Sequence, residues 1–126
     1  MAGRRTPYIE DIIAGLKTVE GRLNRDKFSR YRPGDLVYLR EDRVLADGNV
    51  VEIPNRILVS ITRVDVYATF AGMLAQVGLA PVLPRAKSFA TAVSEYQAIY
   101  TDADEANYGV LAIHFEVVMV NPPPPA

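Results

Sequence analysis

A cation, an anion and a second cation lie within six residues of one another at Lys17, Glu20 and Arg22. A glutamate near two cations stays ionised, and burial at the edge of a core lowers the pKa of a lysine. Such groups can polarise a carbonyl and move a proton. We therefore predict Lys17 and Glu20 as catalytic residues and Arg22 as a substrate-binding residue. The alternative is a structural ion pair that joins a helix to a sheet.

The residues before this trio predict a short helix. Pro7 fits the first position of a helix, with Thr6 as its N-cap. Apolar residues then recur at helical spacing as far as Leu16. Gly15 suits the left-handed conformation that ends many helices. We also expect Tyr8, on this helix, to contribute to substrate binding.

The trio itself is predicted to follow a bend into a strand at residues 17–23. In a strand, Thr18, Glu20 and Arg22 share one face, while Lys17 and Val19 share the other. A bend at Lys17 still lets its ammonium group reach the Glu20 side. Thr18 is therefore a further candidate for substrate binding.

The rest of the chain predicts a mixed structure in which strands do not alternate regularly with helices. Further strands are expected at residues 36–39, 50–53, 56–67 and 109–118, and further helices at 70–77 and 89–100. A change of apolar parity between Ile61 and Val64 indicates a bulge. Residues 79–87 contain two prolines and are predicted to be a loop. This order favours an α+β fold built on a small mixed β-barrel over a doubly wound sheet.

Composition limits the kinds of site and the location. A chain of 126 residues with 49% hydrophobic content forms one domain with a real core. There is no cysteine and only one histidine, so we expect no metal and no cofactor. No apolar run reaches the roughly 20 residues that a membrane span needs, so we expect a cytoplasmic protein without a membrane partner. We predict a flexible lead at 1–6, one domain at 7–118 and a disordered proline-rich tail at 119–126.

Basic residues are concentrated in the first third of the chain. Residues 1–43 carry ten of the 14 Lys and Arg residues, although the net charge of the whole chain is −1. This distribution suits an anionic partner on one face, or else an ordinary mixed-charge surface. Arg25 and Lys27, in the basic segment 24–32, are candidates for contacts with a phosphate backbone. A solvated loop is the alternative for that segment.

His114 and several aromatic residues are the remaining candidates. His114 is expected on the strand face opposite Leu111, Ile113 and Phe115, where it can act as an acid, a base or a stacking group. A hydrogen-bonded histidine without a functional role is the alternative. Tyr67, together with aromatic residues at 28, 31 and 38, can form a stacking platform for a nucleobase or can belong to the core.

These residues also carry a family resemblance. Residues 15–22, G-L-K-T-V-E-G-R, match the G-x-K-x-x-E-x-R signature of ASCH domains, and the R-P-G-D turn at 32–35 follows it in the expected order. Later segments resemble one branch of that family: Y-A-T-F-A-G-M-L at 67–74, G-L-A-P-V-L-P at 78–84, I-Y-T at 99–101 and Y-G-V-L-A-I-H-F at 108–115. The resemblance implies a PUA-like β-barrel of about five strands with flanking helices. It also implies a cleft that accepts RNA or a modified nucleoside. Many members carry a strand before the first helix, whereas here we expect the chain to begin almost at that helix.

The resemblance leaves the reaction open. Some members hydrolyse N4-acetylcytidine and some are reported as ribonucleases. The small bacterial amidohydrolases resemble this chain at Lys17, but Glu20 stands where they have Thr, and Gln76 stands near the place of a further Glu. We therefore carry three hypotheses: an RNA- or nucleoside-binding domain, a hydrolase of N4-acylcytidine or single-stranded RNA, and a non-catalytic protein-interaction adaptor.

Overall fold

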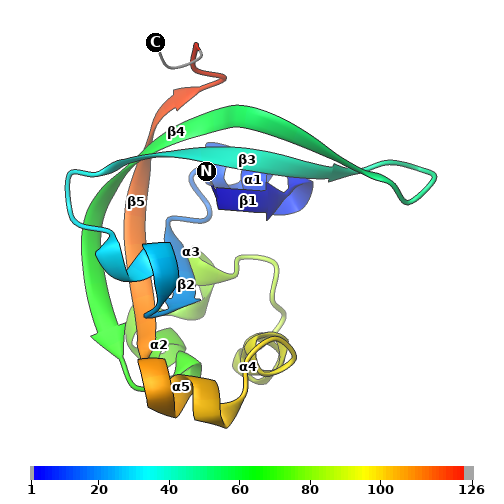
Figure 1. Cartoon of the computed structure of the whole chain (residues 1–126). Helices are drawn as coiled ribbons and strands as arrows, with labels where there is room; N and C mark the ends of the chain where they lie inside the picture. Colours follow the sequence, from blue (N-terminus) through cyan, green and yellow to red (C-terminus); the bar gives the residue numbers. More distant parts are fainter. Residues whose placement is uncertain (1, 124–126) are drawn as a thin grey trace.

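The computed structural model describes residues 2–123, whose strands form one curled five-stranded sheet in the order β1-β3-β4-β5-β2 (Figure 1). The strands are β1 (Ala2–Arg5), β2 (Val19–Leu23), β3 (Leu36–Val44), β4 (Val50–Tyr67) and β5 (Val110–Val120). The α-helices are α1 (Thr6–Ile13), α2 (Phe70–Val77), α3 (Leu79–Val82), α4 (Phe89–Gln97) and α5 (Asp102–Tyr108), and η1 (Asp26–Arg30) is a 3-10 helix. Neighbouring strands are antiparallel except for β1, which runs parallel to β3.

The long strand β4 organises the sheet, because β3 pairs with one of its edges and β5 with the other. Its register with β5 shifts between Ile61 and Arg63, so the predicted bulge is confirmed. The two strands predicted at 50–53 and 56–67 are one strand that contains Pro54. Pairing with β5 begins only at Ile57, and the β3 register is irregular opposite Pro54. The missing N–H of Pro54 therefore costs the ladder little.

Two apolar clusters lie on the two faces of this sheet. One cluster is covered by α1 and includes Ile9, Ile12, Leu39, Ile57, Val59, Ile61, Leu111, Ile113 and Phe115. The other is covered by α2, α3 and α4 and includes Val19, Leu23, Phe70, Met73, Leu74, Val82, Ala92, Tyr96, Val110 and Ala112. Alternate residues of β5 enter different clusters because successive side chains of a strand point to opposite faces. The predicted placement of His114, opposite Ile113 and Phe115, follows from the same alternation.

The predicted helix starts at residues 70 and 89 are confirmed, and local hydrogen bonds set these and a further helix start. Thr69 caps α2, Ser88 caps α4, and Thr101 forms a capping box with Asp104 at the start of α5. Gly15, after α1, has a φ of 77°, as a left-handed helix stop requires. The predicted loop at 79–87 is wrong at its start, because α3 forms there.

The predicted flexible lead is also wrong for the described residues 2–5. These residues form β1, which is held by backbone pairing to β3 from Ala2↔Leu39 to Arg5↔Asp42. Thr6 does not cap α1, because its hydroxyl donates instead to the buried carboxylate of Glu41 at 2.8 Å. At the other end, β5 runs two residues beyond the predicted position 118, and residues 124–126 of the predicted tail lie outside the described part of the chain.

Candidate functional site

The bend after α1 places Lys17 at the centre of the site. The backbone N–H groups of Leu16 and Lys17 both donate to the carbonyl of Asp11, at 2.9 and 3.1 Å, so the chain wraps tightly around the end of the helix. Asp11 is itself buried and accepts two hydrogen bonds from the Arg85 guanidinium. This network fixes the position from which the Lys17 side chain enters the protein.

The Lys17 side chain is only 2% exposed. Its ammonium group donates to the backbone carbonyl of Val19 at 3.0 Å and to that of Val82 in α3, and it lies 4.0 Å from the Glu20 carboxylate. Burial lowers the pKa of Lys17, and Glu20 opposes that shift without cancelling it. The prediction that Lys17 reaches Glu20 across the bend agrees with this geometry.

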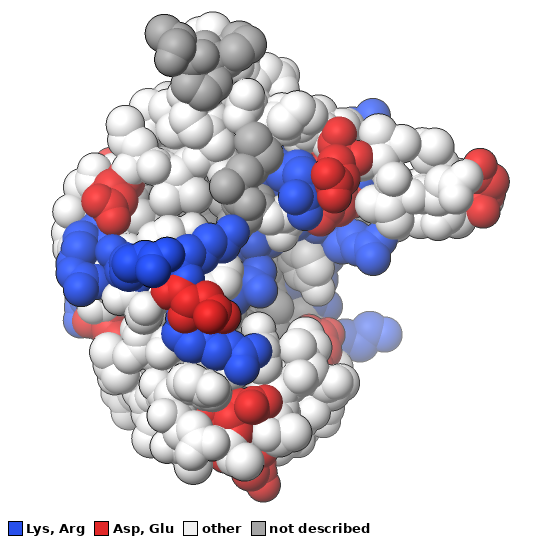
Figure 2. Space-filling view, viewed as in Figure 1, with Lys and Arg blue, Asp and Glu red and all other residues white. Residues whose placement is uncertain are grey.

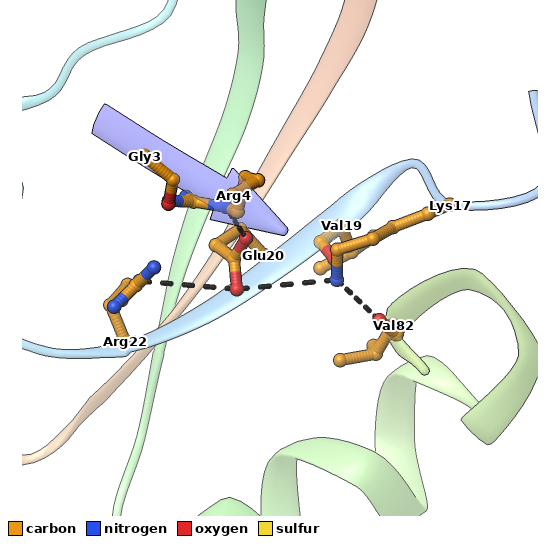
Figure 3. Close-up of polar contacts among 7 residues, drawn as sticks. All are labelled: Gly3, Arg4, Lys17, Val19, Glu20, Arg22 and Val82. Carbon is orange, nitrogen blue, oxygen red and sulfur yellow. Dashed lines mark hydrogen bonds and ion pairs between the residues drawn. The ribbon is translucent and has the colours of Figure 1, made fainter. Parts of the chain in front are cut away.

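Three cations surround the Glu20 carboxylate. Figure 3 shows Lys17 and Arg22 on either side of it along β2, with Arg4 reaching it from β1. The Arg22 Nε atom lies 3.9 Å from the carboxylate, and the Arg4 Nε atom donates to it directly. Burial alone would raise the pKa of Glu20, but the three cations outweigh burial and lower that pKa to about 2. Glu20 is therefore a fixed anion at neutral pH.

Arg4 is the principal site residue that sequence reasoning missed. The strands β1 and β2 are the two outer edges of the sheet order, yet Arg4 on β1 binds Glu20 on β2. The ion pair therefore connects the two edges of the curled sheet. Residues 2–5 read A-G-R-R, which carries no apolar alternation, so the sequence offered no signal for a strand there.

A cavity of about 480 Å³ opens beside this ion-pair cluster. Its lining combines charged residues from β1 and β2 with aromatic and apolar residues from α1, α4 and the segments that follow α3 and α4. The lining residues are Gly3, Arg4, Arg5, Tyr8, Lys17, Glu20, Gly21, Arg22, Leu83, Glu95, Tyr96, Ala98, Ile99 and Tyr100. A volume in this range suits a small organic ligand.

Gly21 allows Tyr96 to form part of this lining. A Cβ atom added at Gly21 would lie 2.6 Å from the Tyr96 hydroxyl oxygen and 2.8 Å from the Met73 Cε atom. Both distances are shorter than van der Waals contact, so any side chain at position 21 would require Tyr96 and Met73 to move. The spacing of Tyr96, Ile99 and Tyr100 predicted a helix that runs to residue 100, but α4 ends at Gln97, and nothing in the sequence paired Tyr96 with Gly21.

Two residues of the cavity lining each hold a buried polar atom that makes no hydrogen bond with a described residue, although the Arg22 Nε atom keeps its ion pair with Glu20 at 3.9 Å. The Tyr96 hydroxyl and the Arg22 Nε atom are inaccessible to water and make no hydrogen bond with any described residue. The Arg22 guanidinium is held from its other side by the Phe28 ring, whose centroid is 5.0 Å away. A third such atom, His114 Nε2, lies outside the lining, so buried polar atoms without a hydrogen bond are not confined to this cavity.

The other predicted residues are placed differently. Tyr8 lines the cavity, and its ring centroid lies 6.0 Å from the Lys17 ammonium. Thr18, Tyr67, Arg25, Lys27 and His114 lie outside the lining.

Each of those outlying side chains has its own surroundings. Tyr67 packs against the cluster under α2 and α4, and the Arg25 guanidinium lies 5.2 Å from the Tyr108 ring centroid. The His114 Nε2 atom lies 3.6 Å from Asp65, and burial lowers the pKa of His114. Burial, and then the charges of Arg4, Arg22 and Arg40, lower the pKa of Lys27, so this cation lies near two arginines of the cavity lining, Arg4 and Arg22.

The surface around the cavity is basic. Figure 2 shows Lys and Arg side chains in a band across the middle of one face, over η1 and β2, with a patch of acidic side chains inside it. The described residues hold no group of three or more acidic or histidine side chains placed to bind a metal ion. Within residues 2–123, no helix combines the length and the apolar character needed to cross a bilayer.

Comparison with known proteins agrees with this architecture. A family model described as the ASCH domain matches residues 4–119. The chain belongs to the ASCH domain family. The predicted resemblance and the α+β, PUA-like fold class are therefore confirmed.

Solved structures of this ASCH domain's relatives show the same fold. The crystal structure of hypothetical protein PH0355 is 33% identical in sequence, over 93% of this chain and 96% of that chain, with a TM-score of 0.74. The solution NMR structure of protein PF0455 from Pyrococcus furiosus is 29% identical, over 93% and 94%, with a TM-score of 0.68. The crystal structure of protein EF3133 from Enterococcus faecalis V583 is 14% identical, over 89% of this chain and 70% of that chain, with a TM-score of 0.50. This similarity shows the fold alone. No curated protein matches this chain.

Proposed function

We propose that this ASCH domain binds RNA or a nucleoside by taking one unstacked nucleobase into the cavity beside Glu20. The observation that carries the proposal is the cavity of about 480 Å³, in which the charged groups of β1 and β2 lie beside aromatic rings from α1 and α4. Sequence-specific recognition of RNA depends on bases that are splayed out, stacked on aromatic rings and hydrogen-bonded along their edges. Membership of the ASCH family and the basic band around the cavity support an RNA ligand.

The chemistry of the lining fits the edge of a base. Glu20 is ionised and accepts hydrogen bonds from amino or imino groups, whereas Tyr96 and Arg22 donate to ring nitrogens or carbonyl oxygens. Tyr8, Tyr96 and Tyr100 supply aromatic rings at the lining. The lining offers both hydrogen-bond donors and an acceptor, so the site favours a ligand that carries both acceptors and donors.

The experiment is a titration of the four ribonucleosides and short single-stranded RNAs by isothermal calorimetry at low salt. We expect at least one nucleoside to bind, and we expect Arg22→Met to weaken that binding by about tenfold because a charged hydrogen bond is lost. The control is Arg63→Gln, an exposed arginine on β4 outside the cavity. Absence of binding by every nucleoside and RNA, or equal affinity in Arg22→Met, would refute the proposal.

A hydrolase in the same cavity is the second candidate, because burial lowers the pKa of Lys17 next to a carboxylate. The substrate would be an N4-acylcytidine or single-stranded RNA. Two observations favour binding over hydrolysis. The Lys17 ammonium already donates to two backbone carbonyls. Glu20, with a pKa of about 2, is also a weak base for shuttling a proton at neutral pH.

Turnover assays separate these two candidates. With the wild-type protein in excess over N4-acylcytidines or labelled RNA, the ligand should bind. Product should form no faster than it does with the Lys17→Ala variant. Product formation that Lys17→Ala abolishes would establish the hydrolase instead. The adaptor hypothesis depends on the proline-rich tail or on an exposed helix as the protein-binding element. Residues 124–126 of the tail are outside the described part of the chain, and the hypothesis stays a prediction.

A further inference from the structure

A second cavity, of about 630 Å³, lies next to the first at the junction of β1 and α1. Its lining residues are Arg5, Thr6, Pro7, Tyr8, Asp42, Arg43, Val44 and Arg85. Arg5 and Tyr8 line both cavities, so the two are adjacent. Figure 2 shows a notch below the projecting β3–β4 hairpin, with Lys and Arg side chains beside it.

Two of the three arginines in this second cavity are held in place by buried carboxylates. The Arg85 guanidinium donates to Asp11 at 2.8 and 3.1 Å, and the Arg43 Nε atom donates to Glu41 at 2.9 Å. Both side chains are nevertheless about half exposed, at 55% and 51%. A guanidinium has five N–H donors, so each arginine keeps donors for a further acceptor.

Arg5 adds a third positive charge, near the Asp42 carboxylate. The hydrogen bond from Arg40 and, to a smaller extent, the charge of Arg5 lower the pKa of Asp42. The Arg5 side chain is exposed and makes no ion pair or hydrogen bond with any described residue. Asp42 is the only acidic residue among those that line the second cavity, and Arg40 already binds its carboxylate at 2.7 and 3.3 Å. The cavity therefore presents a net positive charge with donors already fixed in position.

We propose that the second cavity binds a phosphate group of the ligand whose base enters the first cavity. This inference rests on the proposed function and makes the ligand a nucleotide or an RNA strand in preference to a free nucleoside. Arginine suits the role because its planar fork of N–H groups matches the oxygens of a phosphate. Pre-fixed guanidinium groups also lose little conformational entropy on binding. Tyr8, which lines both cavities, lies between the base and the phosphate.

The test compares each ribonucleoside with its 5′-monophosphate and its 3′-monophosphate by calorimetry, with inorganic phosphate as a separate arm. We expect one monophosphate of the best nucleoside to bind about tenfold more tightly than the nucleoside, since charge-assisted hydrogen bonds are added. Inorganic phosphate should bind more weakly than that monophosphate, because it gains nothing from the first cavity.

Arg43→Gln is the decisive variant because Arg43 lines only the second cavity. Its partner Glu41 keeps Arg56 and Thr6, so the fold should persist, which thermal melting of the free variant checks. The gain in affinity from the phosphate group should largely disappear in Arg43→Gln and in Arg5→Gln. Arg43→Gln should keep the wild-type affinity for the nucleoside. The matched control Arg63→Gln should keep the whole gain.

The two proposals fail in different ways. Equal affinity of the nucleoside and both monophosphates, or a gain that survives in the Arg5→Gln, Arg43→Gln double variant, would overturn the phosphate site alone. Failure of every nucleoside and nucleotide to bind the wild-type protein would overturn the proposed function itself.

Discussion

The hydroxyl of Tyr96 should make the free protein less stable while strengthening its binding to ligand. It is buried and makes no hydrogen bond with any described residue. The ring stacks on Phe70 with centroids 4.1 Å apart and an interplanar angle of 9°. Tyr96→Phe keeps the ring and this stacking and removes only the hydroxyl oxygen, so it isolates the unpartnered group.

The expected sizes follow from the cost of an unsatisfied polar group. A buried hydroxyl without a partner costs about 1–3 kcal/mol. Removing the oxygen removes this cost but leaves a small void, which is itself destabilising. We therefore expect Tyr96→Phe to stabilise the free protein by only about 1 kcal/mol. For a domain of this size this raises the Tm by about 3–5 °C. Loss of the hydrogen bond to the ligand should weaken binding by about tenfold.

Urea unfolding of the free protein and calorimetric titration of its best nucleoside measure the two effects. Tyr108→Phe is the matched control, because Tyr108 is 44% exposed and lies outside the first cavity. That variant should change neither stability nor affinity.

The reasoning is refuted by either of two results. If Tyr96→Phe lowers the stability of the free protein, the hydroxyl has a partner and is not an orphan. If affinity for the ligand stays unchanged, the hydroxyl does not contact the ligand and the base lies elsewhere.

Three further predictions concern the same site. Gly21→Ala should displace Tyr96 and Met73, destabilise the protein by about 1–3 kcal/mol in urea unfolding and abolish nucleoside binding; unchanged binding would contradict the close contact. The folded pKa of Glu20, about 2, lies below its unfolded value near 4.5, so Glu20 contributes about 3 kcal/mol above pH 4.5 that is lost as pH falls through 2. The free energy of unfolding, measured from pH 7 to pH 2, should therefore depend less on pH in Glu20→Gln than in the wild-type protein. An equal pH dependence in the two proteins would count against the lowered pKa of Glu20. Lys17→Met should lower the free energy of unfolding by about 3–5 kcal/mol, because the buried acceptors around Lys17 lose their donor. An unchanged melting temperature would show that Lys17 is not structural.

Much of the fold was predictable because local chemistry decided it. Thr69, Ser88 and Thr101 begin helices through hydrogen bonds to N–H groups three residues later, which depend only on neighbouring positions. The parity change near Ile61 likewise indicated a bulge. The N-terminal strand was not predictable, since residues 2–5 have no apolar pattern and depend on pairing with β3.

For the site, the sequence by itself determined that Lys17, Glu20 and Arg22 lie around one bend, because spacing along a strand and a glycine stop are local properties. Only the tertiary structure decided what these charges do. Curling of the sheet brings Arg4 from the opposite edge strand onto Glu20, and packing of α4 brings Tyr96 against Gly21. Both contacts join segments far apart in the chain, and their strength comes from burial and low dielectric, which no local pattern encodes.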